Sequence, residues 1–269
     1  MNKLNIYCLS LYNEGYDKIR SLGYMPVGLG DNNFDARWLK DNIGKNISQK
    51  NKFYGEYTFH YWFWKNKLRE ISDNEWTGFC TYRRFWTSDE NLYEIKKKSD
   101  FLENLDSNYK DYDVILGDYT HMDGWSMMKI IKHGLKSFIL NPKYLIKKNR
   151  NLKLHFDSFH GYGNLEKAIN LLDSNDREDF RKFTETQNYY NKGNMFICKS
   201  KKIFDAYYNT VFTWLKKCEE IFGFTGIGYG DTRMYGFLIE RFCPYWFNKY
   251  TKVKILPIAF LDINKTEII

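Results

Sequence analysis

The chain has 269 residues, of which 43% are hydrophobic and 28% are charged. These values are typical of one large folded domain, or of one domain with a small appendage, and argue against a disordered chain. The formal net charge of +8, with lysines spread along the whole chain, favours anionic partners such as phosphorylated small molecules, nucleic acid or anionic lipid.

Short apolar runs alternate with stretches of helical periodicity. The runs predict strands over 4–9, 25–29, 76–82, 113–116, 194–198 and 253–260, and the periodic stretches predict helices over 54–70, 92–105, 164–172, 201–220 and 231–243. Strands separated by helices indicate an α/β fold with a largely parallel central sheet flanked by helices. Such sheets bind ligands beyond the carboxyl ends of their strands, so we expect the site there.

The first apolar run is too short to span a membrane, and no signal-peptide pattern accompanies it. We therefore expect a cytoplasmic protein whose basic charge is compatible with peripheral association at the inner face of the inner membrane. No two cysteines have CxxC spacing, which argues against a zinc site. Cys8, Cys80 and Cys198 lie inside apolar runs, which predicts buried free thiols. The five cysteines are Cys8, Cys80, Cys198, Cys218 and Cys243.

The predicted helix 54–70 is unusually aromatic, with YGEYTFHYWFWKNKL at its start. A helix that is apolar on every side is expected to be buried. Glu56 and His60 lie one turn apart among these rings, and a buried carboxylate needs a partner or a function. We expect Glu56 to hydrogen-bond His60 or the backbone, or else to support a site.

Two adjacent arginines follow the predicted strand 76–82, in the sequence TYRRFW. The guanidinium group offers a planar fork of donors that matches a diphosphate. Neighbours in a strand point to opposite faces, so one of Arg83 and Arg84 is expected to bind ligand and the other a structural carboxylate. A surface arginine pair without function is the alternative.

Two glycine-containing segments supply further polar candidates. In NYYNKGNMFIC, we expect a tight turn at Gly193 before a strand, where the backbone could approach a ligand closely. An ordinary turn into a core strand is the alternative. In GFTGIGYGDTRMYGFLIERF, four glycines lead to Asp231, the predicted N-cap of a helix that carries Glu240. Gly236 lies one turn before Glu240 and leaves room near it. The glycine run has no Walker lysine and indicates a flexible or lid-like loop.

The spelling Asp111–Tyr112–Asp113 is that of a metal-binding Asp-x-Asp motif, but it precedes its apolar run. Carboxylates that hold a metal in such folds stand at the exit of the strand. We therefore expect a solvated loop here and assign no metal ligand.

Several of these motifs, in this order, resemble the DUF4422 family of bacterial capsule and O-antigen glycosyltransferases. The matching segments are PVGLG, DNIGKNISQKN, YGEYTFHYWFWKN, GFCTYRRF, NKGNMFICKSKKIFDAYY and YGFLIERF. The similarity spans most of the chain and is weakest over about residues 87–185. We therefore expect one glycosyltransferase domain over 1–269, with 87–185 as an inserted, more variable helical or acceptor-binding region. The family usually has His where this chain has Thr81.

The resemblance implies a nucleotide-sugar-binding fold of the GT-A type. It implies transfer of a hexose, with galactofuranose as a candidate, from a nucleotide-diphosphate donor to a growing surface polysaccharide or lipooligosaccharide. A UDP-sugar is the favoured donor. The acceptor is expected to be a glycan, either free or linked to a lipid. No cofactor is expected, because the YRR motif takes the place of the metal-binding motif of other relatives; Mn²⁺ or Mg²⁺ assistance is the alternative.

Roles for single residues follow from the resemblance. Tyr82, Arg83 and Arg84 would bind the donor diphosphate and neutralise the charge that develops on it. Glu240, and after it Asp231, would take the acceptor proton; a salt bridge from Glu240 to an arginine is the alternative. The resemblance assigns sugar or acceptor contacts to Asn191, Gly193 and Asn194, and it places Glu56 and His60 behind the site, with Glu56 holding an arginine of the YRR motif.

Three other classes of protein compete with this interpretation. A non-catalytic carbohydrate-binding module would explain the 19% aromatic content, but not the arginine pair or the buried carboxylates. A nucleotidyltransferase on a similar fold would need a metal, for which no convincing carboxylate pair is present. No RNP, KH or helix-turn-helix pattern supports nucleic-acid binding.

Overall fold

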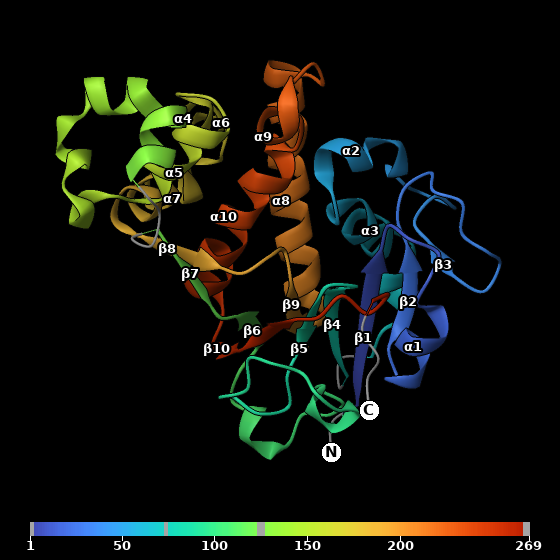
Figure 1. Ribbon diagram of the computed structural model, residues 1–269. Helices are drawn as coiled ribbons and strands as arrows, with labels where there is room; N and C mark the ends of the chain where they lie inside the picture. Colours follow the sequence, from blue (N-terminus) through green and yellow to red (C-terminus); the bar gives the residue numbers. More distant parts are fainter. Residues whose placement is uncertain (1–2, 73–74, 123–126, 266–269) are drawn as a thin grey trace.

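The computed structural model describes residues 3–72, 75–122 and 127–265 (Figure 1). Its main sheet has the strand order β10-β6-β9-β4-β1-β2-β3, in which only β9 runs antiparallel to its neighbours. The predicted largely parallel α/β sheet is therefore confirmed. The strands on this path are β1 (Leu4–Ser10), β2 (Met25–Gly28), β3 (Leu39–Lys40), β4 (Trp76–Thr81), β6 (Val114–Gly117), β9 (Phe196–Cys198) and β10 (Val253–Leu256).

Two short antiparallel pairings complete the strand arrangement. β5 (Arg84–Trp86) folds back on β4 and pairs with β11 (Ile258–Phe260), so the segment after β10 returns to the end of β4. β7 (Tyr119–His121) and β8 (Tyr189–Asn191) form a separate two-stranded ribbon.

Side-chain alternation gives the sheet two apolar faces, as the period of two along a strand requires. In β1, Tyr7 and Leu9 enter one core cluster, whereas Ile6 and Cys8 enter the other. The first cluster lies under helices that carry aromatic residues and is the larger of the two. These helices are α2 (Asn51–Tyr54), α3 (Tyr57–Trp62), α8 (Lys201–Phe222) and α10 (Met234–Tyr250). The second face is covered by α1 (Tyr16–Ser21), the loops of 95–105 and the segment that includes β11.

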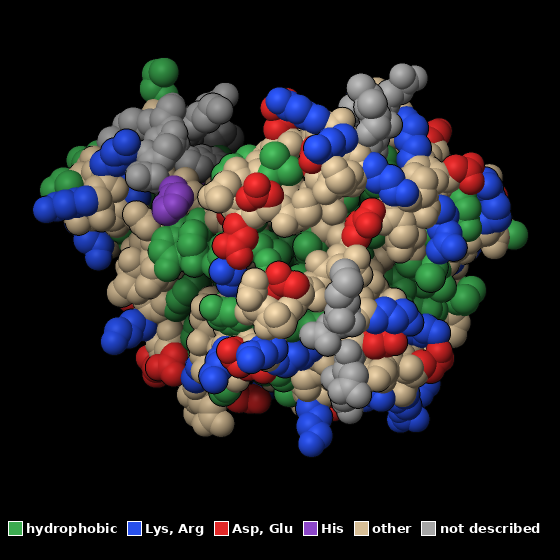
Figure 2. Space-filling view, turned by 90° about the horizontal axis from the view of Figure 1, so that it is seen from below, with side chains coloured by type: hydrophobic (Ala, Val, Ile, Leu, Met, Phe, Trp, Pro, Cys, Tyr) green, Lys and Arg blue, Asp and Glu red, His purple; other side chains and the backbone are tan. Residues whose placement is uncertain are grey.

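Four helices form a lobe beside α10, away from β1 to β3 (Figure 1). They are α4 (Met127–Leu140), α5 (Leu152–Phe159), α6 (Asn164–Asn170) and α7 (Ser174–Thr186). The inner helices of this lobe share the first core cluster, to which Phe156, Leu165 and Phe180 belong. Lysine and arginine side chains project at the left edge of Figure 2, the side on which this lobe lies in Figure 1.

Several predicted elements need correction. The helix 54–70 is interrupted at Gly55, whose φ of 59° ends α2, and α3 is followed by a π-helical turn (Phe63–Lys67) and a 3-10 turn (Leu68–Glu70). The predicted helix over 92–105 is wrong, because only a 3-10 turn (Lys98–Asp100) forms there. The Asp100 carboxylate accepts hydrogen bonds from the backbone N–H groups of Lys96 and Lys97 in the preceding loop. The strand 253–260 is split at Pro257 into β10 and β11.

The helix 231–243 is also divided differently. Asp231 lies inside the short helix α9 (Gly228–Thr232), and Arg233 stands at the start of α10, so the predicted N-cap role of Asp231 is wrong. The remaining 3-10 turns are Ser48–Lys50, Ser107–Tyr109, Pro142–Leu145 and Lys147–Asn149. No helix in the described ranges combines the length and apolarity that a membrane span requires.

Candidate active site

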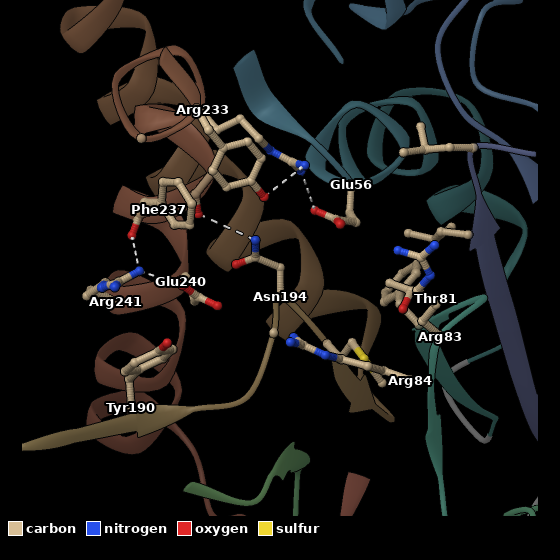
Figure 3. A pocket seen from close by; sticks show the side chains of 18 of the residues that line it. Glu56, Thr81, Arg83, Arg84, Tyr190, Asn194, Arg233, Phe237, Glu240 and Arg241 are labelled. Atoms are coloured by element: carbon tan, nitrogen blue, oxygen red, sulfur yellow. Dashed lines mark hydrogen bonds and ion pairs between the residues drawn. The ribbon is translucent and has the colours of Figure 1, made fainter. Parts of the chain in front are cut away.

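A cleft of about 830 Å³ opens at the carboxyl ends of the parallel strands β1 and β4. This is the position that the ligand rule for such sheets predicts. Leu9 and Thr81 mark the two strand ends, and α10 and the turn before β9 form the opposite wall (Figure 3). Its charged lining consists of four arginines and two glutamates: Arg83, Arg84, Arg233, Arg241, Glu56 and Glu240. The positive excess suits an anionic ligand.

The two arginines of the YRR motif have different surroundings. Arg83 donates from Nε to Oδ2 of Asp262 at 3.1 Å, and its guanidinium lies 4.8 Å from the centre of the Tyr82 ring. Arg84 begins β5, is exposed, and extends into the cleft (Figure 3). The prediction that one arginine binds a structural carboxylate is confirmed for Arg83, which leaves Arg84 as the candidate for the ligand.

Gly193 makes room for Arg84. It has a φ of 67°, and a Cβ at this position would lie 3.2 Å from Arg84 Nη1. A side chain here would be strained by the backbone conformation and would press on the guanidinium group. The tight turn predicted from NKGN therefore shapes the space round an arginine of the cleft.

Glu240 extends from α10 into the same cleft, facing Arg84 across the cavity (Figure 3). Its carboxylate accepts a hydrogen bond from Nη1 of Arg241, so the salt bridge considered as an alternative is present. Burial raises the pKa of Glu240, and the charges of Arg241 and Arg84 offset this only in part, while Glu56 adds to it. A carboxylate whose pKa is raised inside a cleft is suited to accept a proton near neutral pH.

Arg241 is held rigidly from several sides. Only 1% of it is exposed. Its Nη2 lies 3.0 Å from His155 Nδ1, and its guanidinium lies 4.5 Å from the centre of the Tyr190 ring. Burial, with the charge of Arg241, lowers the pKa of His155, so His155 is neutral and can accept this hydrogen bond. These contacts fix the position of the carboxylate of Glu240.

Glu56 pairs with an arginine that the sequence did not single out. Glu56 Oε2 lies 3.4 Å from Arg233 Nη2, so the predicted pairing with the YRR motif or with His60 is wrong. Gly55 has a φ of 59°, which favours glycine, and a Cβ at this position would lie only 2.1 Å from the same nitrogen. His60 is fully buried, and its Nδ1 lies 2.9 Å from the Tyr208 hydroxyl.

The other predicted site residues divide between the cleft and its surroundings. Tyr82 and Asn194 line the cleft, and Asn194 donates to the Gly236 carbonyl at 3.4 Å. Asn191 is 3% exposed, donates to the Gly117 carbonyl and is outside the lining. Asp231 is exposed and also lies outside it.

The Asp-x-Asp segment has a structural role at the start of β6. Asp113 Oδ2 accepts the backbone N–H of Lys252 at 3.0 Å. Across the described part of the chain, no three His, Cys, Asp or Glu side chains are grouped as metal ligands would be. Independence from a metal stays a prediction.

Sequence reasoning missed three residues of the site: Arg233, Arg241 and His155. Arg241 had a local signal, because it follows Glu240 on a helix that is otherwise apolar. A buried carboxylate beside an arginine in such a helix indicates an ion pair.

The solved structures place this fold in a class. One is described as the "WbbM bifunctional glycosytransferase apo structure"; it matches with a TM-score of 0.65 and 20% identity, over 96% of this chain and 45% of that chain. The chain thus spans less than half of that glycosyltransferase, with which it shares a fold, and the predicted GT-A-like fold class is confirmed. The mannosyltransferase Ktr4p from S. cerevisiae matches over 89% of this chain and 62% of that chain, with a TM-score of 0.30 and 11% identity.

The family follows from the sequence match. Residues 11–252 match the model of the family described as "Domain of unknown function (DUF4422)", and the chain belongs to that family. No curated protein matches the chain.

Proposed function

We propose that the chain is a bacterial glycosyltransferase of surface-polysaccharide or lipooligosaccharide assembly. It would transfer a hexose, with galactofuranose as a candidate, from a nucleotide-diphosphate donor to a glycan acceptor. The observation that carries the proposal is one cleft in which exposed Arg84 faces the largely buried carboxylate of Glu240. A UDP-sugar is the favoured donor, and a lipid-linked acceptor at the inner face of the inner membrane belongs to the same proposal.

The chemistry divides between the two walls of the cleft. Arg84, with Tyr82 and Arg83 beside it, would bind the diphosphate and stabilise the negative charge that grows as the bond from the anomeric carbon to the phosphate oxygen breaks. That oxygen leaves with the bonding electron pair. The acceptor hydroxyl oxygen forms the new bond to the anomeric carbon, and in an inverting transfer its proton passes to Glu240. Asn194 and Gly193, in the turn before β9 and among the residues that line the cleft, would contact the sugar.

Arg84 takes the part that a divalent metal has in other nucleotide-sugar enzymes, so the proposal includes no metal. A guanidinium fork can hold two phosphate oxygens at once. Asn191 and Asp231 lie outside the cleft lining, and the proposal gives them no direct contact with donor or acceptor.

A thermal-shift panel tests the proposal. UDP, GDP, CMP and dTDP compounds are each added with Mn²⁺ and with EDTA. A ligand at 100 times its Kd adds roughly 2.7 kcal/mol to the unfolding free energy, which is a rise of roughly 5–10 °C in Tm for a chain of this size. We expect one nucleoside diphosphate to stabilise the protein in EDTA.

Variants assign the effect to the cleft. Arg84→Ala should abolish the shift and lower the transfer rate by roughly 10²–10³. The matched control is Arg20→Ala, which removes an exposed arginine outside the cleft lining and should change neither. Stabilisation that requires Mn²⁺ would contradict the arginine-for-metal part of the proposal, and no shift with any nucleotide would favour a carbohydrate-binding module.

A further inference from the structure

The positive charge of the chain comes from one segment. The chain holds 41 basic and 33 acidic residues, but residues 124–156 contain eight basic residues and no acidic one. The rest of the chain is therefore balanced, with 33 residues of each sign. Lysines occur throughout, and the absence of acidic residues is what makes this segment basic.

The same segment exposes a row of large aliphatic side chains. On α4, Met128, Leu135 and Ile139 are 81%, 56% and 69% exposed. They are seven and four residues apart, which places them on one face of a helix of 3.6 residues per turn. Leu145 and Ile146, in the turn after α4, are also exposed.

This row is held outward by packing on the opposite side. Phe138 and Tyr144 are 6% exposed and form a small core cluster with Leu154 of α5. Ser137, half a turn from the exposed row, is 1% exposed. The helix is thus anchored to the lobe, and its outer aliphatic face is left without a covering element among the described residues.

Exposed lysines surround the aliphatic row. Lys136 lies on α4, and Lys143, Lys147 and Lys148 lie in the turns that follow it. Lysine and arginine side chains project at this edge of the molecule (Figure 2). The segment contains no acidic residue, and none of these four lysines forms an ion pair with a residue that the structure describes. The surface therefore combines protruding aliphatic groups with unpaired positive charge.

We propose that this surface, formed by α4 and the turns to residue 149, binds an anionic lipid bilayer. Aliphatic side chains that protrude from a basic amphipathic helix enter the boundary between headgroups and acyl chains, while lysines contact anionic headgroups. A nucleic acid would use the lysines but would gain little from the aliphatic row, and a neutral protein partner would gain little from the lysines.

Helix α5 connects this surface to the cleft. Leu154 belongs to the small cluster beneath the surface, whereas Phe159 and His160, at the far end of the same helix, line the cleft. Given the proposed function, on which this step rests, a bilayer bound at α4 would bring a lipid-linked acceptor close to the cleft.

Vesicle flotation tests the proposal with the full chain. Vesicles of phosphatidylcholine alone are compared with vesicles that also contain phosphatidylglycerol, at low and high salt. We expect binding only to the anionic vesicles and weaker binding at high salt. The triple variant Lys143→Gln/Lys147→Gln/Lys148→Gln should partition roughly 100-fold less, because each lysine near an anionic surface contributes about fivefold. Leu135→Ser/Ile139→Ser should also reduce binding.

Two control variants remove the same number of lysines, or of aliphatic side chains, from exposed positions outside the proposed surface. Lys182→Gln/Lys202→Gln/Lys216→Gln removes the same charge from exposed positions elsewhere. Ile43→Ser/Ile221→Ser removes two exposed aliphatic side chains outside both the surface and the cleft lining. Both controls should bind anionic vesicles as well as the unmodified chain does.

Several results would overturn the proposal: no binding to anionic vesicles, equal binding to neutral ones, or equal losses in the controls. Binding of an oligonucleotide as tight as that of vesicles would indicate a polyanion site. A dimer that disappears in Leu135→Ser/Ile139→Ser by sedimentation velocity would indicate self-association. Nucleotide thermal shifts without vesicles are unaffected by any of these variants, so failure here is distinguishable from failure of the proposed function.

Discussion

Glu240→Gln should remove activity while leaving the protein at least as stable as before. Glutamine keeps the shape of the side chain and an oxygen that accepts from Arg241. Because burial raises the pKa of Glu240, the folded protein holds this proton more tightly than the unfolded chain. The contribution of Glu240 to stability therefore falls as pH rises from the ordinary glutamate pKa to the raised value, and it remains low above it. Glutamine avoids this penalty at pH 7.

A structural role for the Glu240–Arg241 ion pair would instead predict a large loss of stability in Glu240→Gln. If the ion pair with Arg241 holds the fold together, breaking it should cost about 3–5 kcal/mol, which is a fall of roughly 6–20 °C in Tm at about 2–4 °C per kcal/mol. Thermal melts at pH 7 separate the two cases. Glu166→Gln is the control, because its pKa is lowered by Lys153 and Arg181 despite partial burial, and it should lose a little stability.

The kinetic part uses the same variants. Loss of a general base lowers kcat by roughly 10²–10⁴, whereas Glu166→Gln should transfer sugar at the original rate. The acid limb of kcat/KM should lie above the ordinary glutamate range, because the base works only when deprotonated. Full activity in Glu240→Gln, or a Tm fall of the size given above, would refute the assignment.

Three further predictions concern other parts of the chain. Gly55→Ala should lower the unfolding free energy by about 1–3 kcal/mol and displace Arg233, since a Cβ would lie 2.1 Å from Nη2. Gly223→Ala, with a similar backbone conformation and open space around it, should carry only the backbone part, and equal losses in thermal melts would contradict the clash. Burial lowers the pKa of His60 to about 3, so its contribution to stability falls as pH drops below 6.5, and His60→Gln should cost roughly 2–3 kcal/mol less at pH 4.5 than at pH 7 in denaturant titrations. All five cysteines are buried free thiols and should react with a thiol reagent only on unfolding; fast reaction in native buffer would argue against the packing of the core.

Local patterns were sufficient for most of the sheet. The run at 76–82 became β4, because alternating side chains there have an apolar face on each side of the sheet. The helix over 54–70 could not be predicted as it is: Gly55 leaves the helical conformation at a φ of 59°, and Arg233, from a distant part of the chain, lies against it. Helical periodicity carries no information about such a contact.

In the site, too, local sequence predicts some features, and contacts between distant segments determine the others. The forked donors of Arg84 and the burial of Glu240 could be expected from neighbouring residues, but their meeting in one cleft depends on the order of the strands. Asn191 illustrates the failure: in β8, its amide donates to the Gly117 carbonyl, a partner that only strand pairing brings near. Asp262, the partner of Arg83, lies in a segment to which no function was assigned.

The pairing of β11 with β5 has a consequence for biosynthesis. Arg84 begins β5, and Asp262 follows β11 and holds Arg83. Both arginines are synthesised early but acquire these supports only after the ribosome has added residues 258–262. A nascent or prematurely terminated chain that stops before this point would lack both the strand that pairs with β5 and the carboxylate that holds Arg83. Translation order thus delays the ordering of this arginine pair until residue 262 has been added.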